Sequence, residues 1–423
     1  MNTAPHTPSQ DPGPFRLGYV ASHAFRLTFE INEIAELRRQ DPSARVYSFY
    51  RKQGEGIQHA RLEEIGGDIL SWSPVALISG LFYFLMRKPL GLLGAFASLM
   101  WVSKSNPVYW VKNAAVFAVA LPFLADAHRE GVTHLHADFG SSPATIAWLG
   151  RRLLGTGFSI RYHSFDIHLD TPAYRDPLRR RKIEDADLVV AVHEDGLAHL
   201  KKRAPAAASG KFLVIRICVV FNPDPKPDQI PQPPLVLAAG NLVPAKGFDV
   251  LVRAVGELAE RGVDVRLRIL GEGPERSRLE ELVGECGVAD RTEMPGYYRH
   301  HELAGHLAQA LALVVPARIA GSGAREGLPT VIAESWLSRT PVVASPIGGI
   351  PEVVVDGKTG LLFETENPRT LADRIERLAA DPGLQRALAD AGRKKAAELF
   401  SPEKNVRTLI ESIKSTTRFT PTG

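Results

Sequence analysis

Two glutamates, Glu326 and Glu334, lie on either side of a Gly-Leu-Pro-Thr turn and offer the clearest chemistry in this chain. The apolar run 311–317 before them is typical of a buried parallel strand, a Gly/Ser-rich loop follows, and an amphipathic helix is predicted over 330–337. Strand, loop and helix in this order present ligands at the carboxyl end of a parallel strand. We therefore expect Glu326 on the loop and Glu334 about one turn inside the helix.

Two carboxylates held in this way can accept hydrogen bonds from two separate groups of hydroxyls on one ligand. The backbone N–H groups of the predicted helix start, from Leu328 to Thr330, would face an anion between them. A polyhydroxylated ligand that carries a phosphate fits this arrangement, and this pattern predicts a nucleotide sugar. The alternative is that Glu326 and Glu334 are a helix N-terminal acid and an exposed helical acid, both of which are common.

The chain of 423 residues is long enough for two domains, and helical patterns alternate with short apolar strands along most of it. This alternation predicts α/β domains with parallel sheets. The formal charge of +4 does not indicate a nucleic-acid partner, but basic residues cluster at 151–152, 179–182 and 201–203. These clusters are either solvated surface or sites for an anionic membrane or substrate. The two cysteines lack metal-type spacing and favour a reducing compartment, which predicts a cytoplasmic protein.

Prolines mark the expected domain boundaries. Residues 1–14 are polar and Pro-rich, and we expect a disordered leader there rather than a signal peptide. Six prolines in the thirteen residues 222–234 cannot continue a helix or a central strand, so this segment is predicted to be the interdomain linker. The first domain is then 15–221 and the second 235–401. A last helix, about 402–418, is expected to pack back on the first domain.

The region between Ile69 and Ala125 is unusually apolar. Its predicted helices, Pro74–Met86 and Pro89–Val102, are each shorter than the roughly 20 residues that cross a hydrocarbon core. Two interpretations stay open. The helices are core elements of the first domain, or they form a surface that lies on the inner face of a membrane, with aromatic and basic side chains at the headgroup level: Trp101, Lys104, Trp110 and Lys112.

Several further motifs accompany the two glutamates, at 240–247 (Gly-Asn-Leu-Val-Pro-Ala-Lys-Gly), 271–274, 348–352, 136–140, 163–167 and 28–34. Together they resemble the retaining, nucleotide-sugar-dependent glycosyltransferases of family 4, and the motifs of the first half resemble the branch that builds exopolysaccharides such as colanic acid. The resemblance is densest from Gly240 to Phe363 and weaker over 16–415. It implies an α/β fold of the GT-B type, in which two Rossmann-like domains face each other across a deep cleft.

The resemblance also implies roles for individual residues. Glu334 would hold ribose hydroxyls, Glu326 would contact the transferred sugar, and Lys246 would neutralise the diphosphate, whose negative charge grows in the transition state. His163 would face the sugar from the opposite domain. The catalytic residues implied are thus Glu326, His163 and Lys246. The donor-binding residues implied are Gly240, Asn241, Gly271, Tyr297, Gly327, Leu328, Pro329, Thr330 and Glu334.

The implied reaction transfers a sugar from a UDP- or GDP-sugar to a glycan or a lipid-linked glycan, in exopolysaccharide or cell-envelope polysaccharide biosynthesis, with retention of the anomeric configuration. It requires no metal and no cofactor. Three alternatives stay open: a sugar-nucleotide epimerase of the same fold, a phosphorylase that uses pyridoxal phosphate, and a binding subunit without catalytic activity.

Two features depart from the family pattern. Asn241 stands where the family usually carries Arg, and it brings neither charge nor the guanidinium fork, so Arg318 or Arg325 would have to compensate or diphosphate binding would be weaker. The segment 22–25, after the first strand, is not a Gly-Gly phosphate loop.

Three other signals have structural interpretations. The sequence 185–187 mimics the Asp-x-Asp metal motif of a different glycosyltransferase fold, but it precedes a predicted strand and is interpreted as an ordinary loop. His136 is interpreted as a residue that orients a loop, and Asp166 as a turn cap.

Overall fold

The computed structural model describes residues 15–22, 27–49, 65, 69–104, 106–168, 176–204, 211–227 and 231–416. The expected leader 1–14, most of the segment 22–25 and the last two residues of the expected helix 402–418 lie outside these ranges.

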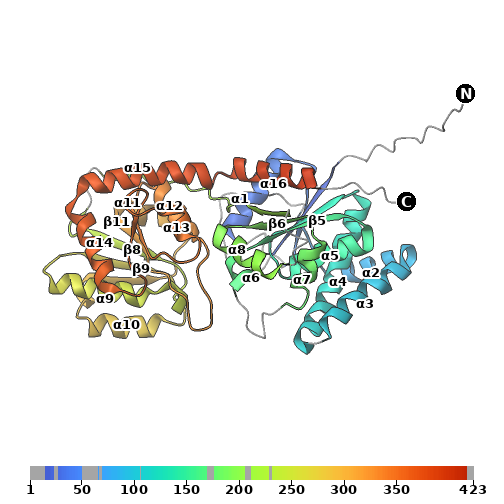
Figure 1. Cartoon of the computed structure of the whole chain (residues 1–423), viewed down its shortest axis with the longest axis horizontal. Coiled ribbons are helices and arrows are strands. Elements are labelled where there is room, and N and C mark those ends of the chain that lie inside the picture. Colours follow the sequence, from blue (N-terminus) through green and yellow to red (C-terminus); the bar gives the residue numbers. More distant parts are fainter. Residues whose placement is uncertain are drawn as a thin grey trace, which may run out of the picture.

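Two parallel sheets form the frame of the molecule, one in each half of the chain (Figure 1). The first has seven strands in the order β3-β2-β1-β4-β5-β6-β7, and the second has six in the order β10-β9-β8-β11-β12-β13. The strands of the first sheet are β1 (Leu17–Ala21), β2 (Arg45–Ser48), β3 (Ile69–Ser71), β4 (His134–Ala137), β5 (Gly157–Tyr162), β6 (Leu188–Ala191) and β7 (Phe212–Val214). Those of the second are β8 (Leu235–Ala239), β9 (Arg266–Leu270), β10 (Thr292–Gly296), β11 (Ala310–Val315), β12 (Val342–Ala344) and β13 (Leu361–Leu362).

Helices connect the parallel strands in both halves. The first half contains α1 (Thr28–Gln40), α2 (Pro74–Arg87), α3 (Pro89–Ser103), α4 (Pro107–Arg129), α5 (Ser142–Leu154), α6 (Ser164–His168), α7 (Arg179–Asp185) and α8 (Glu194–Arg203). The second contains α9 (Phe248–Glu260), α10 (Arg276–Glu285), α11 (Leu303–Gln309), α12 (Thr330–Leu337), α13 (Ile350–Val353), α14 (Pro368–Ala380), α15 (Pro382–Leu399) and α16 (Pro402–Thr416). This confirms the predicted α/β architecture of two Rossmann-like domains.

The central strands are apolar because both of their faces are covered. All six residues of β11 are buried, as expected for a parallel strand with helices on either side of the sheet. Two helices of the first domain start at capping residues: Ser73 accepts from the backbone of Ala76 before α2, and Asn106 caps α4, each followed by a proline at the first helical turn.

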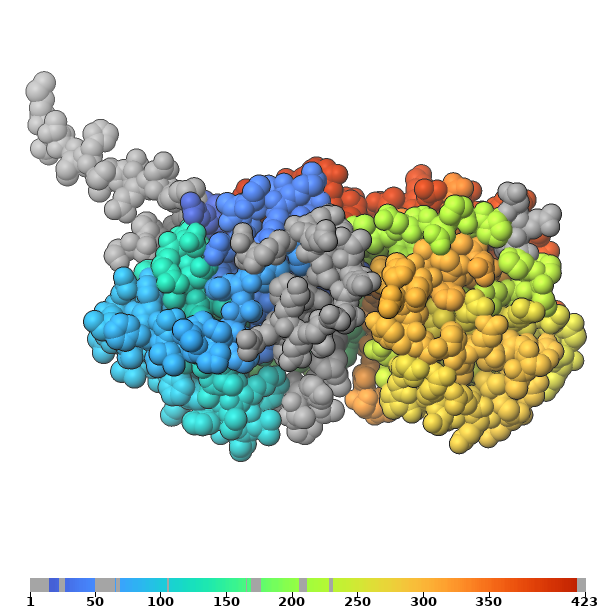
Figure 2. Space-filling model, turned by 180° about the vertical axis from the view of Figure 1, so that it is seen from behind, coloured from blue at the N-terminus to red at the C-terminus, as the bar shows by residue number. Residues whose placement is uncertain are grey.

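The chain passes between the two domains twice. The Pro-rich residues 222–227 and 231–234 carry the first passage without helix or strand. The second lies between α15 and α16, which run along the top of both lobes in Figure 1. α16 leaves the second domain and packs against α1, where Val406, Leu409 and Ile413 join the core beside β1. Figure 2 shows the two lobes from behind, with the red C-terminal helices above them.

Helices α2 and α3 lie at the edge of the first domain farthest from the second (Figure 1). Only two residues of α2, Gly80 and Phe84, are buried, and the interpretation of this region as two core helices is therefore too simple. The 23-residue helix α4, which the sequence pattern did not separate from its neighbours, fills the core beneath them. Among the described residues, α4 is long and apolar enough to span a membrane, but 61% of its most apolar stretch is buried inside the protein. Helices α2 and α3 together are also long and apolar enough, but they are bent by 118° at the break between them.

Candidate active site

A cavity of about 380 Å³ lies between the domains. The carboxyl ends of parallel strands from both sheets open toward it, which is the place where such sheets bind ligands. From the second domain it is lined by the loop before α12, including Glu326, Gly327, Leu328 and Thr330, and from the first domain by Phe29, Phe139, His163 and Ser164. The structure thus brings residues predicted from two distant parts of the sequence into one cavity.

The predicted Lys246 and Glu326 form an ion pair. The Nζ of Lys246 lies 2.9 Å from Oε1 of Glu326, and each side chain is about one-fifth exposed. Lys246 ends the short helical turn Pro244–Lys246, and its stem runs alongside Gly240. Gly247 follows with φ +66, and a Cβ there would lie 2.0 Å from the carbonyl oxygen of Pro316, so only glycine lets the turn approach β11 so closely.

Glu334 is the fifth residue of the eight-residue helix α12, about one turn inside it as expected, and is almost fully buried. Its Oε1 is 2.9 Å from Nε2 of His300, a residue of the short turn His300–Glu302. Sequence reasoning missed His300, because a histidine between strand and helix carries no motif of its own. Burial and the Glu334 carboxylate raise the pKa of the neighbouring Tyr298. The Glu334 carboxylate keeps an acceptor oxygen for a ligand hydroxyl beside the His300 contact.

His163 follows β5 and is 8% exposed. Its ring stacks on Phe139 at 4.3 Å and lies 5.1 Å from Phe29, while Nε2 is 3.1 Å from Oδ1 of Asp138. The Asp138 contact fixes the ring, since a carboxylate on one nitrogen determines which nitrogen carries the proton. The imidazole is therefore held rigidly at the wall of the cavity.

Behind His163 lies a buried charge network that sequence reasoning did not find. Arg161 donates to both Asp138 and Glu33 and is 1% exposed. Burial by itself raises the pKa of Asp138, but Arg161 and His163 outweigh it and hold that pKa below its usual value. Burial raises the pKa of Glu33. Breaking such a buried network by removing one partner is costly, so it holds Asp138 in place.

Residues 222–395 match the model of a family described as glycosyl transferases group 1. The chain is a glycosyltransferase, and its residues 222–395 are those of group 1. It is 26% identical to alpha-D-kanosaminyltransferase of Streptomyces kanamyceticus over 321 residues, which are 71% of this chain and 78% of that protein. It is 32% identical over 276 residues to WcaL of Escherichia coli strain K12, named as a colanic acid biosynthesis glycosyltransferase, covering 63% of this chain and 64% of that protein.

Solved structures show the same fold. Sucrose-phosphate synthase of Thermosynechococcus elongatus superimposes with a TM-score of 0.70 at 22% identity, over 95% of this chain and 99% of that one. The Anabaena protein HepE in complex with UDP superimposes with a TM-score of 0.68 at 16% identity, over 95% of this chain and 100% of that one. The predicted GT-B fold is confirmed.

Lys246, Glu334 and the remaining predicted donor-binding residues of this glycosyltransferase do not line the 380 Å³ cavity. Gly240 and Gly271 come close through their backbones, because a Cβ on Gly271 would lie 1.9 Å from the carbonyl oxygen of Gly240. Pro329 is buried just before α12, Asn241 is exposed, and Tyr297 is 72% exposed. Their roles in the glycosyltransferase remain predictions.

Both arginines suggested as substitutes for the missing Arg at position 241 already have partners. Arg318 donates to Asp249 at 3.0 Å and to the carbonyl of Pro244 at 2.8 Å. Arg325 is 3.2 Å from the Asp195 carboxylate in the other domain. Both arginines therefore already have acidic partners, as Lys246 has in Glu326.

Loop 325–327 of the glycosyltransferase contacts the first domain directly. Ser164 donates to the carbonyl of Arg325 at 3.1 Å. A Cβ on Gly327 would lie 2.7 Å from Cβ of Ser164, so the domains approach each other where glycine removes the side chain. Glu352 strengthens the contact, since it accepts from the backbone of Asp195 and from Arg216, each at 2.9 Å.

The Asp-x-Asp sequence of the glycosyltransferase has structural partners, in line with its interpretation as a loop. Asp187 pairs with Arg151 at 2.8 Å and accepts from the backbone of Phe158. Asp185 accepts from the indole of Trp148 at 2.9 Å. These contacts tie the loop to α5 and β5, and they leave the two acids occupied.

Among the described residues, Glu33, His136 and Asp138 lie close enough together to offer three ligands to a metal. The guanidinium of Arg161 already contacts both of these carboxylates. Its positive charge stands where a cation would need to be, and we do not assign a metal to this group. His136 instead bonds Ser159 at 2.8 Å, and Asp166 accepts from the backbone of Gly140 at 3.0 Å.

Proposed function

We propose that this glycosyltransferase moves a sugar from a UDP- or GDP-sugar to a glycan or lipid-linked glycan, with retention of configuration and without a metal, in exopolysaccharide or cell-envelope polysaccharide biosynthesis. The observation that carries the proposal is that Glu326, in an ion pair with Lys246, lines one cavity together with His163 of the other domain. The complex of HepE with UDP and the naming of WcaL for colanic acid biosynthesis support the donor class and the pathway class.

In the proposed reaction the ammonium of Lys246 leaves Glu326 and pairs with the diphosphate of the donor. The released carboxylate then accepts hydrogen bonds from the sugar hydroxyls and orients the ring, while Glu334 accepts from the ribose. The ammonium stabilises negative charge as the bond between the anomeric carbon and the diphosphate oxygen breaks. The acceptor oxygen bonds to the same face of that carbon, and its proton leaves with the diphosphate. His163 packs against the sugar on the side of the first domain.

The experiment that tests the donor class is thermal stabilisation by a small set of UDP-, GDP- and ADP-sugars. A ligand that binds the folded state raises its melting temperature by mass action. We expect stabilisation by at least one UDP- or GDP-sugar in the presence of EDTA, followed by transfer with an α-to-α or β-to-β product in NMR. Inversion of the anomeric centre, or binding that EDTA abolishes, would contradict the proposal.

We also propose that the glycosyltransferase acts at the inner face of a membrane, through helices α2, α3 and α4. Large apolar side chains on these helices are exposed, including Val75 at 77%, Leu90 at 83% and Trp101 at 70%. The sequence 69–125 holds four basic residues and no acidic one. An apolar surface with basic side chains matches an anionic bilayer, which takes up the apolar groups and attracts the cations.

Sedimentation with vesicles tests this location. We expect the protein to sediment with vesicles that contain phosphatidylglycerol and to remain in the supernatant with phosphatidylcholine alone at high salt. Leu90→Asp places a charge on the exposed face without a buried contact to lose, and we expect it to abolish sedimentation. If the protein sediments with neither kind of vesicle, the proposed membrane-binding surface is wrong.

A further inference from the structure

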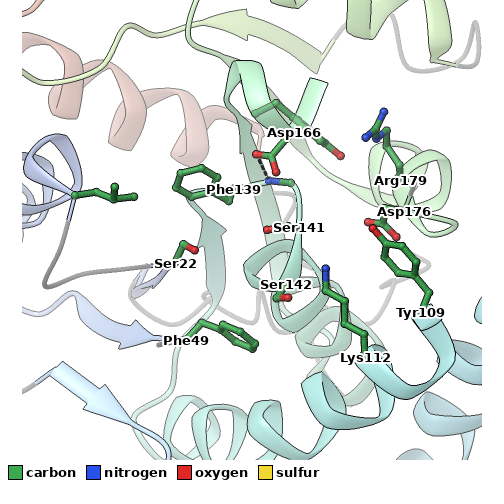
Figure 3. A pocket seen from close by; sticks show the side chains of 13 residues that line it. Ser22, Phe49, Tyr109, Lys112, Phe139, Ser141, Ser142, Asp166, Asp176 and Arg179 are labelled. Atoms are coloured by element: carbon green, nitrogen blue, oxygen red, sulfur yellow. Dashed lines mark hydrogen bonds between the residues drawn. The ribbon is translucent and has the colours of Figure 1, made fainter. Parts of the chain in front are cut away.

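A second cavity, of about 440 Å³, lies wholly within the described part of the first domain (Figure 3). Its wall consists of Ser22, Leu27, Phe49, Tyr109, Lys112, Phe139, Gly140, Ser141, Ser142, Tyr162, Asp166, Asp176 and Arg179. Leu27 and Phe139 also line the cavity between the domains, so the two spaces are neighbours. The reaction proposed above uses none of the polar groups of this second cavity.

Two cations face this space. Lys112 extends from α4 with its ammonium toward the start of α5, and Arg179 extends from the start of α7 (Figure 3). Among the described residues, the side chain of Lys112 contacts only the ring of Tyr109, with its ammonium 5.0 Å from the ring centre, and the guanidinium of Arg179 has no ion pair or hydrogen bond. Charged groups without an anionic partner at the wall of a cavity are suited to an anionic ligand.

The amino end of α5 opens into the same space. This helix has 13 residues, and Ser141 and Ser142 at its start line the cavity without a side-chain cap on the helix. Backbone N–H groups at a helix start favour an anion, a phosphate above all. The same cavity wall contains a second unsatisfied polar group: the hydroxyl of Tyr162 is buried and finds no hydrogen-bond partner among the described residues, and the residue is 1% exposed.

The two acids of the cavity do not cancel these cations. Asp176 lies 2.5 Å from the buried ammonium of Lys182, which also donates to the carbonyl of Gly140. Asp166 accepts from the backbone N–H groups of Gly140 and His163. The charges of Lys112 and Arg179 are therefore left for a ligand.

The apolar surface described above begins at this cavity. Tyr109 and Lys112 line the cavity, while their neighbours on α4, Val108 and Val111, are 65% and 66% exposed. A ligand that fills the cavity with an anionic group can thus place an apolar chain along α4 and still reach the cleft past Phe139.

We propose that this cavity binds the phosphate or diphosphate of a lipid-linked acceptor, whose lipid lies against α2–α4 and whose sugar enters the cleft between the domains. Lys112, Arg179, the start of α5 and the Tyr162 hydroxyl hold the phosphate. This inference rests on the proposed function and narrows its acceptor class.

Calorimetry with monomeric farnesyl diphosphate tests the site in the full-length protein. We expect Lys112→Ala and Arg179→Ala each to weaken binding about tenfold or more, and Tyr162→Phe, which removes only the hydroxyl, to weaken it severalfold. Lys104→Ala is the matched control, because Lys104 is an exposed lysine over an aromatic ring on the same apolar surface, 3.4 Å from Trp101, but does not line the cavity. We expect it to leave binding unchanged.

Other probes separate the parts of the proposal. Farnesol should bind more weakly than farnesyl diphosphate because it lacks the anion, and inorganic pyrophosphate should bind more weakly because it lacks the chain. If pyrophosphate binds as tightly as farnesyl diphosphate, the lipid part of the proposal is wrong. If Lys104→Ala weakens farnesyl diphosphate binding as much as Lys112→Ala and Arg179→Ala do, or if neither of those two variants weakens it, the phosphate site is wrong. Lys112→Ala should still bind nucleotide sugar, so a protein that binds farnesyl diphosphate but no nucleotide would contradict the proposed function and not the phosphate site.

Discussion

The ammonium of Lys246 and the carboxylate of Glu326 lie 2.9 Å apart. Each group is predicted to bind a different part of the donor, one the diphosphate and the other the sugar. A partly exposed ion pair contributes only about 0–1 kcal/mol to stability. The pair therefore keeps both side chains at the cavity at little cost, and a donor can separate them.

Removal of either member of this pair should abolish transfer and spare the fold. We expect Lys246→Ala and Glu326→Ala each to lower kcat/KM by about 100-fold or more, as loss of a fixed charge near a developing negative charge does. Melting temperatures should stay within a few degrees of the parent. Lys358→Ala, an exposed lysine of the same domain, is the control. Full activity in both variants would end the assignment of these residues.

Glu334 should act on donor affinity more than on the chemical step. Glu334→Gln keeps the shape of the side chain and removes its charge, and we expect KM for the donor to rise about tenfold with a smaller change in kcat. Steady-state kinetics with varied donor measures both. A fall in kcat at constant KM would contradict the predicted contact with ribose.

The contact of Glu352 with the first domain should favour the closed arrangement. Without it, Arg216 and the backbone of Asp195 lose their partner across the cleft. We expect Glu352→Ala to increase the radius of gyration in small-angle scattering in the absence of donor, and a bound donor to reverse the increase. Glu281→Ala, an exposed acid on α10, should change nothing. An unchanged radius in both variants would show that the contact does not hold the domains together.

His134 should make the fold sensitive to acid. Burial, with a smaller contribution from Arg151, lowers its pKa to about 3. The unfolded chain, with a pKa near 6.5, binds a proton below that pH and the folded chain does not, so the free energy of unfolding falls as pH drops from about 6.5 toward 3. Uptake of one proton on unfolding corresponds to a slope of about 1.4 kcal/mol per pH unit. We expect His134→Leu to reduce the slope of the free energy of unfolding against pH by about this amount.

Urea unfolding at several pH values between 5 and 7.5 measures that slope. Identical slopes in the parent and His134→Leu would contradict a buried neutral imidazole.

Local patterns predicted the parallel strands, the helix from Thr330 and the two-domain architecture, because burial on both faces of a sheet leaves a clear apolar signature. They also indicated Glu326, which follows a strand on a loop before a helix, whereas the resemblance to family 4 implied Lys246 and His163. The pairing of Lys246 with Glu326 could not be predicted, because the contact depends on how two loops far apart in sequence meet in space.

Other residues were beyond sequence reasoning for a different reason. Arg161 alternates with apolar residues in a strand, a position where polar side chains usually face solvent, and only the structure shows that it is buried against Asp138 and Glu33. Similarly, the apolar sequences of α2 and α3 fit buried core helices and membrane-surface helices equally well. Their exposure depends on α4, which occupies the place beneath them.

The two passages of the chain between the lobes touch each other. The backbone N–H of Val219 donates to the carbonyl of Phe400 at 3.1 Å, and Asn405 spans the carbonyls of Arg216 and Leu399. Two polypeptide segments bound together at one point act as a pivot with a single axis, whereas one flexible segment would allow the lobes to twist freely. Opening and shutting of the substrate cleft should consequently follow one path, in which the far rims travel most and the residues beside Phe400 hardly move.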